Sequence, residues 1–303
     1  MPARATAGGV TAAAADESAA GFEPHRRHLM ALAYRMLGSL AEAEDAAQEA
    51  YLRWREADRA RVANPRAFLS RIVTRLCLDQ LKSARSRRET YVGAWLPEPV
   101  LESAALDADS ASDYAHDLSM ALMLTLERLS PLERAAFLLH DVFEVEFSEI
   151  ASTLGRNEAA CRQLAARARA HIQASRPRYR PSAEESRRLA AAFKQAAESG
   201  NAAGLAAYLA EDAVLVSDGG GKRAAALNPI RGADHIVRLF EGLARKAPPG
   251  QFRLRAAPIN GMPGFVVAEP GGGVQTIALE IADGKIAAIY LVRNPDKLRA
   301  VVF

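Results

Sequence analysis

The spacing of apolar residues divides the chain into a helical first part and a mixed second part. Helical periodicity covers residues 22–90 and 118–176, and prolines at positions 177 and 181 end it. Residues 91–117 contain Trp95-Leu-Pro-Glu-Pro99 and an acidic stretch rich in Ser and Ala, which predicts a linker with one stiff segment. Residues 1–21, mostly small and uncharged, predict a disordered tail.

Residues 177–303 combine helical spacing with alternation. Residues 182–210 predict two helices separated by Gly200-Asn201, and Ala233–Arg245 predicts another helix. Apolar and polar residues alternate in three later runs, which predict antiparallel strands: 264–268, 274–281 and 285–292. The fold class expected is therefore multidomain, with two all-α units followed by an α+β unit.

The segment from Ser148 to Ile172 predicts a helix-turn-helix, because a short helix, a glycine turn at Gly155 and a longer helix follow one another. Asn157 is suited to cap the second helix. At 100° per residue, one narrow arc of that helix is apolar and is expected to pack: Cys161, Leu164, Ala165, Ala168 and Ile172. Four polar residues fall outside the arc: Arg162, Gln163, Arg167 and Arg169. A helical hairpin with a solvated basic face is the alternative.

The composition reveals one locally basic segment and sets few other limits on the class of protein. The 303 residues suit two or three domains, and the net charge of +3 hides seven arginines against one acid in residues 156–180. Cys77 and Cys161 suggest small buried thiols and neither a disulfide nor a metal site. Because the sequence has neither a signal-peptide core nor a spanning apolar run, we expect a soluble, cytoplasmic protein.

Two further helical faces carry charge. On the helix from Ala41 to Arg55, an exposed leucine lies among polar residues opposite an apolar stripe, which indicates either a protein partner or a solvated face: Asp45, Gln48, Glu49 and Leu52. The next helix begins at Asn64-Pro65 and carries a basic face suited to phosphates, or simply solvated: Arg71, Arg75, Lys82 and Arg85. Asp79 is spaced to pair with Arg75.

Several sequence motifs, in the same order along the chain, resemble those of a known protein family. Leu32-Ala-Tyr-Arg-Met-Leu-Gly-Ser39, Ala43-Glu-Asp-Ala-Ala-Gln-Glu-Ala-Tyr-Leu-Arg-Trp54, Asn64-Pro-Arg-Ala-Phe-Leu69 and Leu78-Asp-Gln-Leu-Lys82 resemble region two of bacterial extracytoplasmic-function sigma factors. Leu129-Ser-Pro-Leu-Glu-Arg134 and the helix-turn-helix resemble region four. The resemblance covers residues 25–173 and implies a DNA-binding protein that partners core RNA polymerase and promoter DNA in transcription initiation.

The resemblance also implies roles for the charged faces. Asp45, Gln48, Glu49 and Leu52 match the surface that binds the clamp helices of the polymerase's largest subunit. Arg71, Arg75, Lys82 and Arg85 match the region that engages the opened promoter near the start site. The loop Glu56–Ala63 matches the flipped-base site but has no aromatic residue, and Trp54 is expected in the core.

In the second helix of the helix-turn-helix, Arg162 and Gln163 are placed for base edges of the duplex upstream element. Arg167 and Arg169 are placed for its phosphates.

Residues 182–303 resemble the SnoaL-like branch of the nuclear-transport-factor-two superfamily, a cone-shaped α+β fold. Three motifs match the subgroup of sigma factors with such a fused domain: the linker motif with Trp95, Pro97 and Pro99, the turn Asp218-Gly219-Gly220-Gly221-Lys222, and the tail motif Asn294-Pro295-Asp296-Lys297-Leu298. The resemblance implies regulation in cis, with Trp95 as an apolar anchor and the glycines allowing close backbone approach. A Pro-rich linker and a Gly-rich hairpin without this role are the alternatives.

An enzyme is the competing interpretation of the last domain, because SnoaL relatives include cyclases and isomerases with Asp or His bases. Asp218, Asp234 and His235 are the candidates, although Asp218 resembles a turn residue and Asp234 a helix cap. The glycine turn lacks P-loop spacing. We therefore expect no catalytic residue and no cofactor, and the pocket of the fold leaves a small-molecule ligand open. A promoter-binding regulator that acts without polymerase is a further alternative.

Overall fold

A computed structural model of the protein describes residues 8–101, 117–175, 181–246, 252–269 and 272–303. The chain forms two compact units. Among the described residues, the helical unit comprises 8–83 and 129–170, and the C-terminal unit comprises 84–101, 117–128 and the described residues after 170. The linker up to Leu101 and the short helix before Leu129 therefore pack with the C-terminal residues.

The helical unit is built from amphipathic helices with ordinary caps. Ser39 accepts a hydrogen bond from the backbone N–H of Glu42, and Ser130 and Glu133 form a reciprocal capping box. A π-helical turn, Leu138–Val142, follows α5 (Pro131–Phe137), and a 3₁₀ turn, Arg59–Arg61, lies in the loop before α3 (Pro65–Glu89). The helices are α1 (Gly8–Leu37), α2 (Leu40–Glu56), α3 (Pro65–Glu89), α5 (Pro131–Phe137), α6 (Phe147–Leu154) and α7 (Glu158–Ser175), the last of which runs on into the C-terminal unit.

Helix α1 begins well before the point that the sequence indicated. Residues 1–21 were expected to be a disordered tail, but the helix starts at Gly8. The physical reason is composition, because Ala12–Ala15 and the alanines after them have the highest helix propensity of any residue. Residues 1–7 lie outside the described part of the chain.

The predicted helix-turn-helix is confirmed as a structure. Helix α6 ends at Gly155, whose φ of 62° is the left-handed conformation that glycine adopts freely, and Asn157 caps α7 through the backbone N–H of Ala160 at 2.8 Å. All five residues of the predicted apolar arc are buried: Cys161, Leu164, Ala165, Ala168 and Ile172. Leu164 and Ala165 pack with Ala136 of α5 and with Phe147 and Leu154 of α6.

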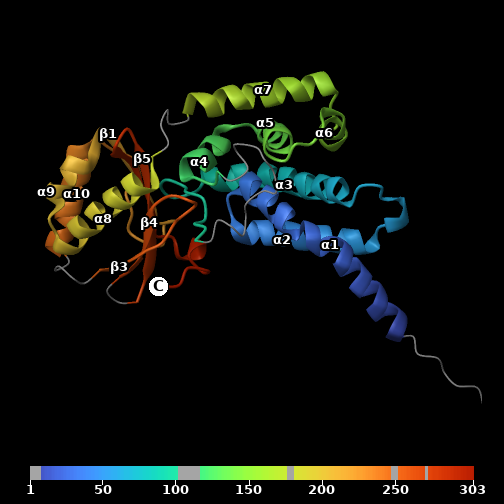
Figure 1. Ribbon diagram of the computed structural model, residues 1–303, viewed down its shortest axis with the longest axis horizontal. Coiled ribbons are helices and arrows are strands. Elements are labelled where there is room, and N and C mark those ends of the chain that lie inside the picture. Colours follow the sequence, from blue (N-terminus) through green and yellow to red (C-terminus); the bar gives the residue numbers. More distant parts are fainter. Residues whose placement is uncertain (1–7, 102–116, 176–180, 247–251, 270–271) are drawn as a thin grey trace, which may run out of the picture. The chain divides into compact units, whose positions relative to one another are not determined.

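The C-terminal unit is a six-stranded sheet with helices (Figure 1). The strand order is β2-β1-β6-β5-β4-β3; β1 pairs with β6 in parallel and the other pairs are antiparallel. The strands are β1 (Leu209–Asp218), β2 (Ile230–Arg231), β3 (Arg253–Ala256), β4 (Gly264–Ala268), β5 (Val274–Ala282) and β6 (Lys285–Val292). The helices are α4 (Met120–Arg128), α8 (Ala183–Ser199), α9 (Ala202–Leu205) and α10 (Ala233–Lys246), with 3₁₀ turns at Ala206–Tyr208 and Pro295–Lys297.

The two faces of this sheet carry different cores. On one face, Phe193 of α8 and Ile236 of α10 pack with Leu279 and Ile289 of the central strands. On the other face, alternate residues of the same strands, such as Tyr290, pack with residues of the linker, of α4 and of the chain's end: Leu96, Met120, Leu298 and Val301. The second face of the sheet is therefore covered by the linker, by α4 and by the end of the chain.

No helix among the described residues is long and apolar enough to cross a membrane. Cys77 and Cys161 are buried free thiols, as expected, and burial raises the pKa of each. The described residues contain no cluster of His, Cys, Asp and Glu that suits a metal ion.

Candidate functional site

The first candidate surface lies on α2. Asp45 and Gln48 are exposed, Leu52 is 38% exposed, and half-buried Glu49 accepts a hydrogen bond from Arg53 at 3.0 Å. The opposite stripe is buried, including Trp54, which is 3% exposed and confirms the expected core position. These four residues, which we call the clamp face, therefore offer two acids, an amide and a leucine on a helix whose fold does not depend on them.

The basic face of α3 is arranged differently from the prediction. Asp79 pairs with Lys82 at 2.8 Å and not with Arg75, so the expected pair is wrong. Arg75 instead donates to the carbonyl oxygens of Thr153 and Ser152, at 3.3 and 3.2 Å, near the C-terminal end of α6. Those carbonyls form the negative end of a helix and suit a guanidinium. Arg71 is half-buried, and the side chain of Arg85 lies outside the described residues.

The polar side of α7 splits into two pairs. Arg162 and Gln163 are exposed near the start of the helix; Arg162 pairs with Glu158 one turn away, at 2.5 Å, and its guanidinium lies 5.4 Å from the centroid of the Phe147 ring of α6. Arg167 and Arg169 bind acids from other elements, Glu133 at 3.0 Å and Asp141 at 2.6 Å. The first pair is thus exposed, whereas Arg167 and Arg169 are held by acids of α5 and of the π-helical turn that follows it.

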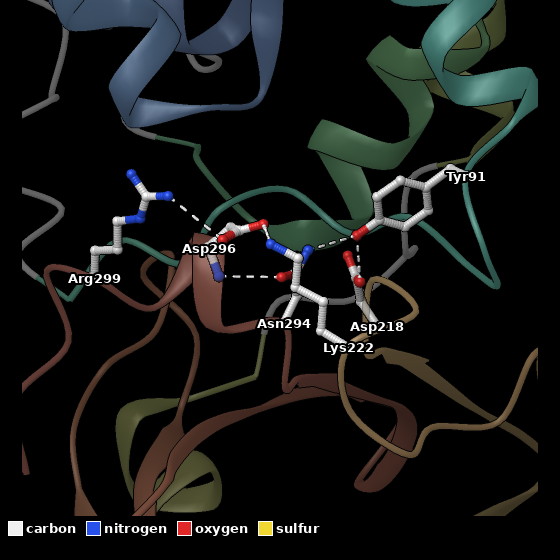
Figure 2. A network of polar contacts seen from close by, with 6 residues as sticks. All are labelled: Tyr91, Asp218, Lys222, Asn294, Asp296 and Arg299. Atoms are coloured by element: carbon white, nitrogen blue, oxygen red, sulfur yellow. Dashed lines mark hydrogen bonds and ion pairs between the residues drawn. The ribbon is translucent and has the colours of Figure 1, made fainter.

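The fourth candidate site is a polar network inside the C-terminal unit, centred on the buried carboxylate of Asp218 at the end of β1 (Figure 2). Oδ1 accepts from the Tyr91 hydroxyl at 2.6 Å, and Oδ2 accepts from the backbone N–H of Leu96 at 2.9 Å and from Lys297 Nζ at 2.7 Å. Asn294 Nδ2 also donates to the Tyr91 oxygen at 2.9 Å. One carboxylate therefore joins the first strand, the linker and the tail motif. We call these contacts the linker network.

Lys297 lies between the linker and Asp218. Its ammonium is 4.2 Å from the ring centroid of Trp95 and 5.1 Å from that of Tyr91, and it donates to the carbonyl oxygen of Leu96. The expected apolar anchor, Trp95, is only half-buried and acts as the face of this cation site. Leu96 is the fully buried anchor, because it packs in the second core of the sheet. Pro97 and Pro99 are buried beside it.

The glycine turn and the tail motif fit against each other at close range. A Cβ on Gly220 would lie 2.2 Å from Asn294 Nδ2, and one on Gly219 would lie 2.1 Å from the carbonyl oxygen of Arg223. A Cβ on Gly221 would meet Val92 of the linker at 3.3 Å. The glycines thus permit close backbone approach, and the backbone N–H of Asn294 reaches the carbonyl oxygen of Asp218 at 2.9 Å.

The outer part of the same region is a surface ion pair. Lys222 binds Asp296 at 2.5 Å, Arg299 lies 3.4 Å from the same carboxyl group, and Pro295 beside it is exposed. The hydrogen bond from Lys222 holds the pKa of Asp296 below its ordinary value. At the centre of the network, burial and the hydrogen bond to Asp218 raise the pKa of Tyr91. Tyr91 therefore stays protonated and keeps donating to the carboxylate.

The residues considered for catalysis do not form a site. Asp234 and His235 are exposed at the start of α10, and His235 Nδ1 lies 2.9 Å from the carbonyl oxygen of Arg231. Asp218 is not the exposed turn residue expected from its glycine neighbours, because the linker covers its carboxylate. All of its recorded contacts hold protein groups in place.

Sequence reasoning missed two participants in the C-terminal unit. Tyr91 lies at the start of the linker, outside the Trp-Leu-Pro-Glu-Pro motif. Asn260 lies in the turn between β3 and β4, and no predicted role included it. A signal was present for Asn260, because Asn-Gly is the preferred pair for a two-residue hairpin turn.

Comparisons with known proteins agree with this organisation. Residues 22–87 match sigma-70 region 2, and residues 119–172 match sigma-70 region 4. The chain is similar to the ECF RNA polymerase sigma factor SigJ of Mycobacterium tuberculosis, at 41% identity over 91% of each chain. It is also similar to the probable ECF sigma factor SigI of that organism, at 32% identity over 94% of this chain and 97% of the relative. The crystal structure of SigJ superposes with a TM-score of 0.72 at 37% identity, covering 92% of this chain and 97% of that one.

Two sigma-70 regions followed by an α+β unit define the class as a sigma-70-type transcription protein with an appended α+β domain. With a relative at 41% identity along almost its whole length, the chain belongs to the extracytoplasmic-function RNA polymerase sigma factors. Sigma factors bind core RNA polymerase and promoter DNA to initiate transcription. The predicted fold class and the assignment to a sigma factor and not an enzyme are thereby confirmed.

Proposed function

We propose that the C-terminal unit regulates this sigma factor in cis by holding the linker between its two sigma regions. The observation that carries the proposal is the Asp218 carboxylate, which is 0% exposed and accepts hydrogen bonds from Leu96 and Tyr91 of the linker. A buried carboxylate costs several kcal/mol unless its partners are in place. The linker is therefore part of what makes this unit stable.

Such a contact regulates because it competes with other uses of the linker. If polymerase or promoter binds a form in which the linker is released, the apparent affinity falls by the fraction of molecules in that form. Each hydrogen bond that favours the held form lowers that fraction about twofold to tenfold. The network thus acts on initiation without touching DNA or polymerase.

The exposed surfaces supply the contacts of initiation itself in this proposal. The clamp face binds the polymerase, and Arg71, Arg75, Lys82 and Arg85 hold the opened downstream element. Arg162 and Gln163 read base edges of the upstream element, while Arg167 and Arg169 bind its phosphates. These steps take place in the cytoplasm, and a small-molecule ligand of the C-terminal unit would act through the same network.

The test is run-off transcription with purified core polymerase on the promoter upstream of the protein's own operon, using the full chain. Lys297→Met removes the ammonium that neutralises Asp218 but keeps the length of the side chain. Lys222→Met is the matched control, because its ion pair with Asp296 is about half exposed and contributes little.

We expect Lys297→Met to change the amount of transcript about fivefold or more and Lys222→Met to leave it unchanged. Equal transcript from the native protein and both variants would overturn regulation through the linker. Absence of transcript from every protein, together with failure to bind core polymerase, would contradict the proposed roles of the exposed surfaces.

A further inference from the structure

The hairpin between β3 and β4 ends in a turn that is unusual for its burial. Asn260 and Gly261 both have positive φ, 51° and 71°, as a two-residue hairpin turn requires, and Ile259 and Met262 close the turn with two backbone hydrogen bonds. Hairpin tips normally lie in solvent. Here Asn260 is 1% exposed and Ile259 is fully buried.

The linker covers this turn. Residues near both ends of the linker bond to it. Val100 and Asn260 exchange two hydrogen bonds, from Asn260 N–H to the Val100 carbonyl at 2.8 Å and from Val100 N–H to Asn260 Oδ1 at 3.0 Å. Asn260 Nδ2 donates to the carbonyl oxygen of Leu118 at 3.1 Å. A single side-chain amide thus bonds the chain just before residues 101–117 and just after them.

This position requires asparagine on chemical grounds. The side chain must offer an acceptor to Val100 and a donor to Leu118, which an amide does and a carboxylate or hydroxyl in the same place does less well. The backbone must adopt positive φ, which asparagine tolerates better than most residues. The two partners also fix which amide atom is oxygen and which is nitrogen.

The geometry brings two residues on either side of the linker's middle, Val100 and Leu118, to the same side chain. Fully extended, the chain from Val100 to Leu118 would span about 60 Å. In the structure, Val100 and Leu118 both bond to the single side-chain amide of Asn260. The first end follows the segment that leaves sigma region two, and the second leads directly into α4, where region four begins.

We propose that Asn260 is the residue through which the C-terminal unit keeps the two ends of the linker together. The two sigma regions then separate fully only after the two bonds to Val100, or the one to Leu118, have opened. This inference deepens the proposed regulation in cis and rests on it. It adds a second contact, on a different loop from the linker network, that sets the reach of the two DNA-binding regions.

The test compares two substitutions in the full chain. Asn260→Gly keeps the turn, because glycine adopts positive φ freely, but removes both side-chain bonds. Asn260→Asp keeps the acceptor for Val100 and places a carboxylate oxygen against the Leu118 carbonyl, so it opens one end only. The control is Asp283→Gly in the exposed turn between β5 and β6, where Asp283 also has positive φ, 48°.

Two readouts are needed. Hydrogen exchange should show the Val100 amide exchanging about tenfold faster in Asn260→Gly and nearly unchanged in Asp283→Gly. In run-off transcription, Asn260→Gly and Asn260→Asp should each raise the amount of promoter-specific transcript about twofold to tenfold, and the control should not.

The results separate this inference from the proposal beneath it. If Lys297→Met changes the transcript while neither Asn260 variant does, Asn260 does not control reach and the inference is overturned, although regulation in cis stands. A fall in transcript with Asn260→Asp would overturn it as well. If Lys297→Met and both Asn260 variants all leave transcript unchanged, the proposed regulation fails together with the inference.

Discussion

The clamp face and the linker network differ in how their functional groups relate to the fold. On α2, Asp45 and Gln48 point into solvent, and the helix is held by a separate buried stripe. In the C-terminal unit, Asp218 is fully buried and its partners are themselves parts of the folded core. Exposed groups such as Asp45 can be substituted without changing the stability of the fold. Substituting a buried group such as Asp218 changes both function and stability.

The largest effect should come from removing the charge at the centre of the network. Asp218→Asn keeps the shape of the side chain but removes the counter-ion of Lys297, whose side chain is only 13% exposed. We expect a loss of about 3 kcal/mol in the free energy of unfolding, measured by urea denaturation with tryptophan fluorescence. Asp296→Asn, which changes an exposed pair, should cost less than about 1 kcal/mol. Equal losses from the two variants would show that burial does not distinguish them.

On the clamp face, charge should affect binding and leave stability alone. The double variant Asp45→Lys, Glu49→Lys should weaken binding to core polymerase by about 2 kcal/mol, or roughly thirtyfold, at an unchanged unfolding midpoint. Asp212→Lys, an exposed acid in β1, is the control for a general charge effect. Fluorescence anisotropy of each labelled variant titrated with core polymerase measures the binding, and urea denaturation measures the stability. Normal binding by the double variant would favour a regulator that acts without polymerase.

Helix α7 allows the same comparison within one element. Arg162→Ala should lower affinity for the native upstream element by about 1–3 kcal/mol and relax the preference for one base pair. Arg167→Ala should weaken binding to all sequences alike and reduce the salt dependence by about one counter-ion. Titrations at several salt concentrations on matched and altered duplexes separate the two. If the two variants showed the same base preference and the same salt dependence, the proposed base contact of Arg162 would be wrong.

A buried group in the helical unit should make its stability depend on pH. Arg66 donates to His28 Nδ1 at 3.1 Å, the other ring nitrogen contacts Ser70 Oγ at 2.8 Å, and the ring packs on Phe143. Burial, with the Arg66 charge, lowers the pKa of His28 from 6.5 to about 3. Between these values the unfolded chain binds a proton that the folded protein does not, so stability falls as pH decreases.

The slope expected from His28 is at most about 1.4 kcal/mol per pH unit below pH 6.5. Urea denaturation at pH 7, 6 and 5 measures it, and His28→Gln should remove that part of the slope. An unchanged pH dependence in the variant would mean that other groups cause it.

Much of the helical unit could be predicted because its information is local. The spacing of Cys161, Leu164 and Ala168 fixes which side of α7 is buried, and Gly155 and Asn157 mark its start. The alternation in β4 and β6 gave those strands their observed bounds. Periodicity also placed Arg162 and Gln163 on the outer side, as the structure has them.

The linker network could not be derived from spacing, because its bonds join residues far apart in sequence. Tyr91 and Asn294 are 203 positions apart, and Leu96 and Asp218 are 122 apart. A local pattern made Asp218 look like a turn residue and Trp95 like the anchor. Only the fold brings Leu96 into the core and the carboxylate beneath the linker. The resemblance to sigma factors pointed to the motifs, but not to the contacts between them.

The most direct test of regulation through the linker is to measure hydrogen exchange at the Leu96 amide and run-off transcription in the same series: native protein, Lys222→Met, Lys297→Met and Asp218→Asn. The Leu96 N–H donates to Asp218, so its exchange reports whether the linker is held. The account predicts that transcript changes in step with exchange across the four proteins. Faster exchange with an unchanged transcript would contradict it.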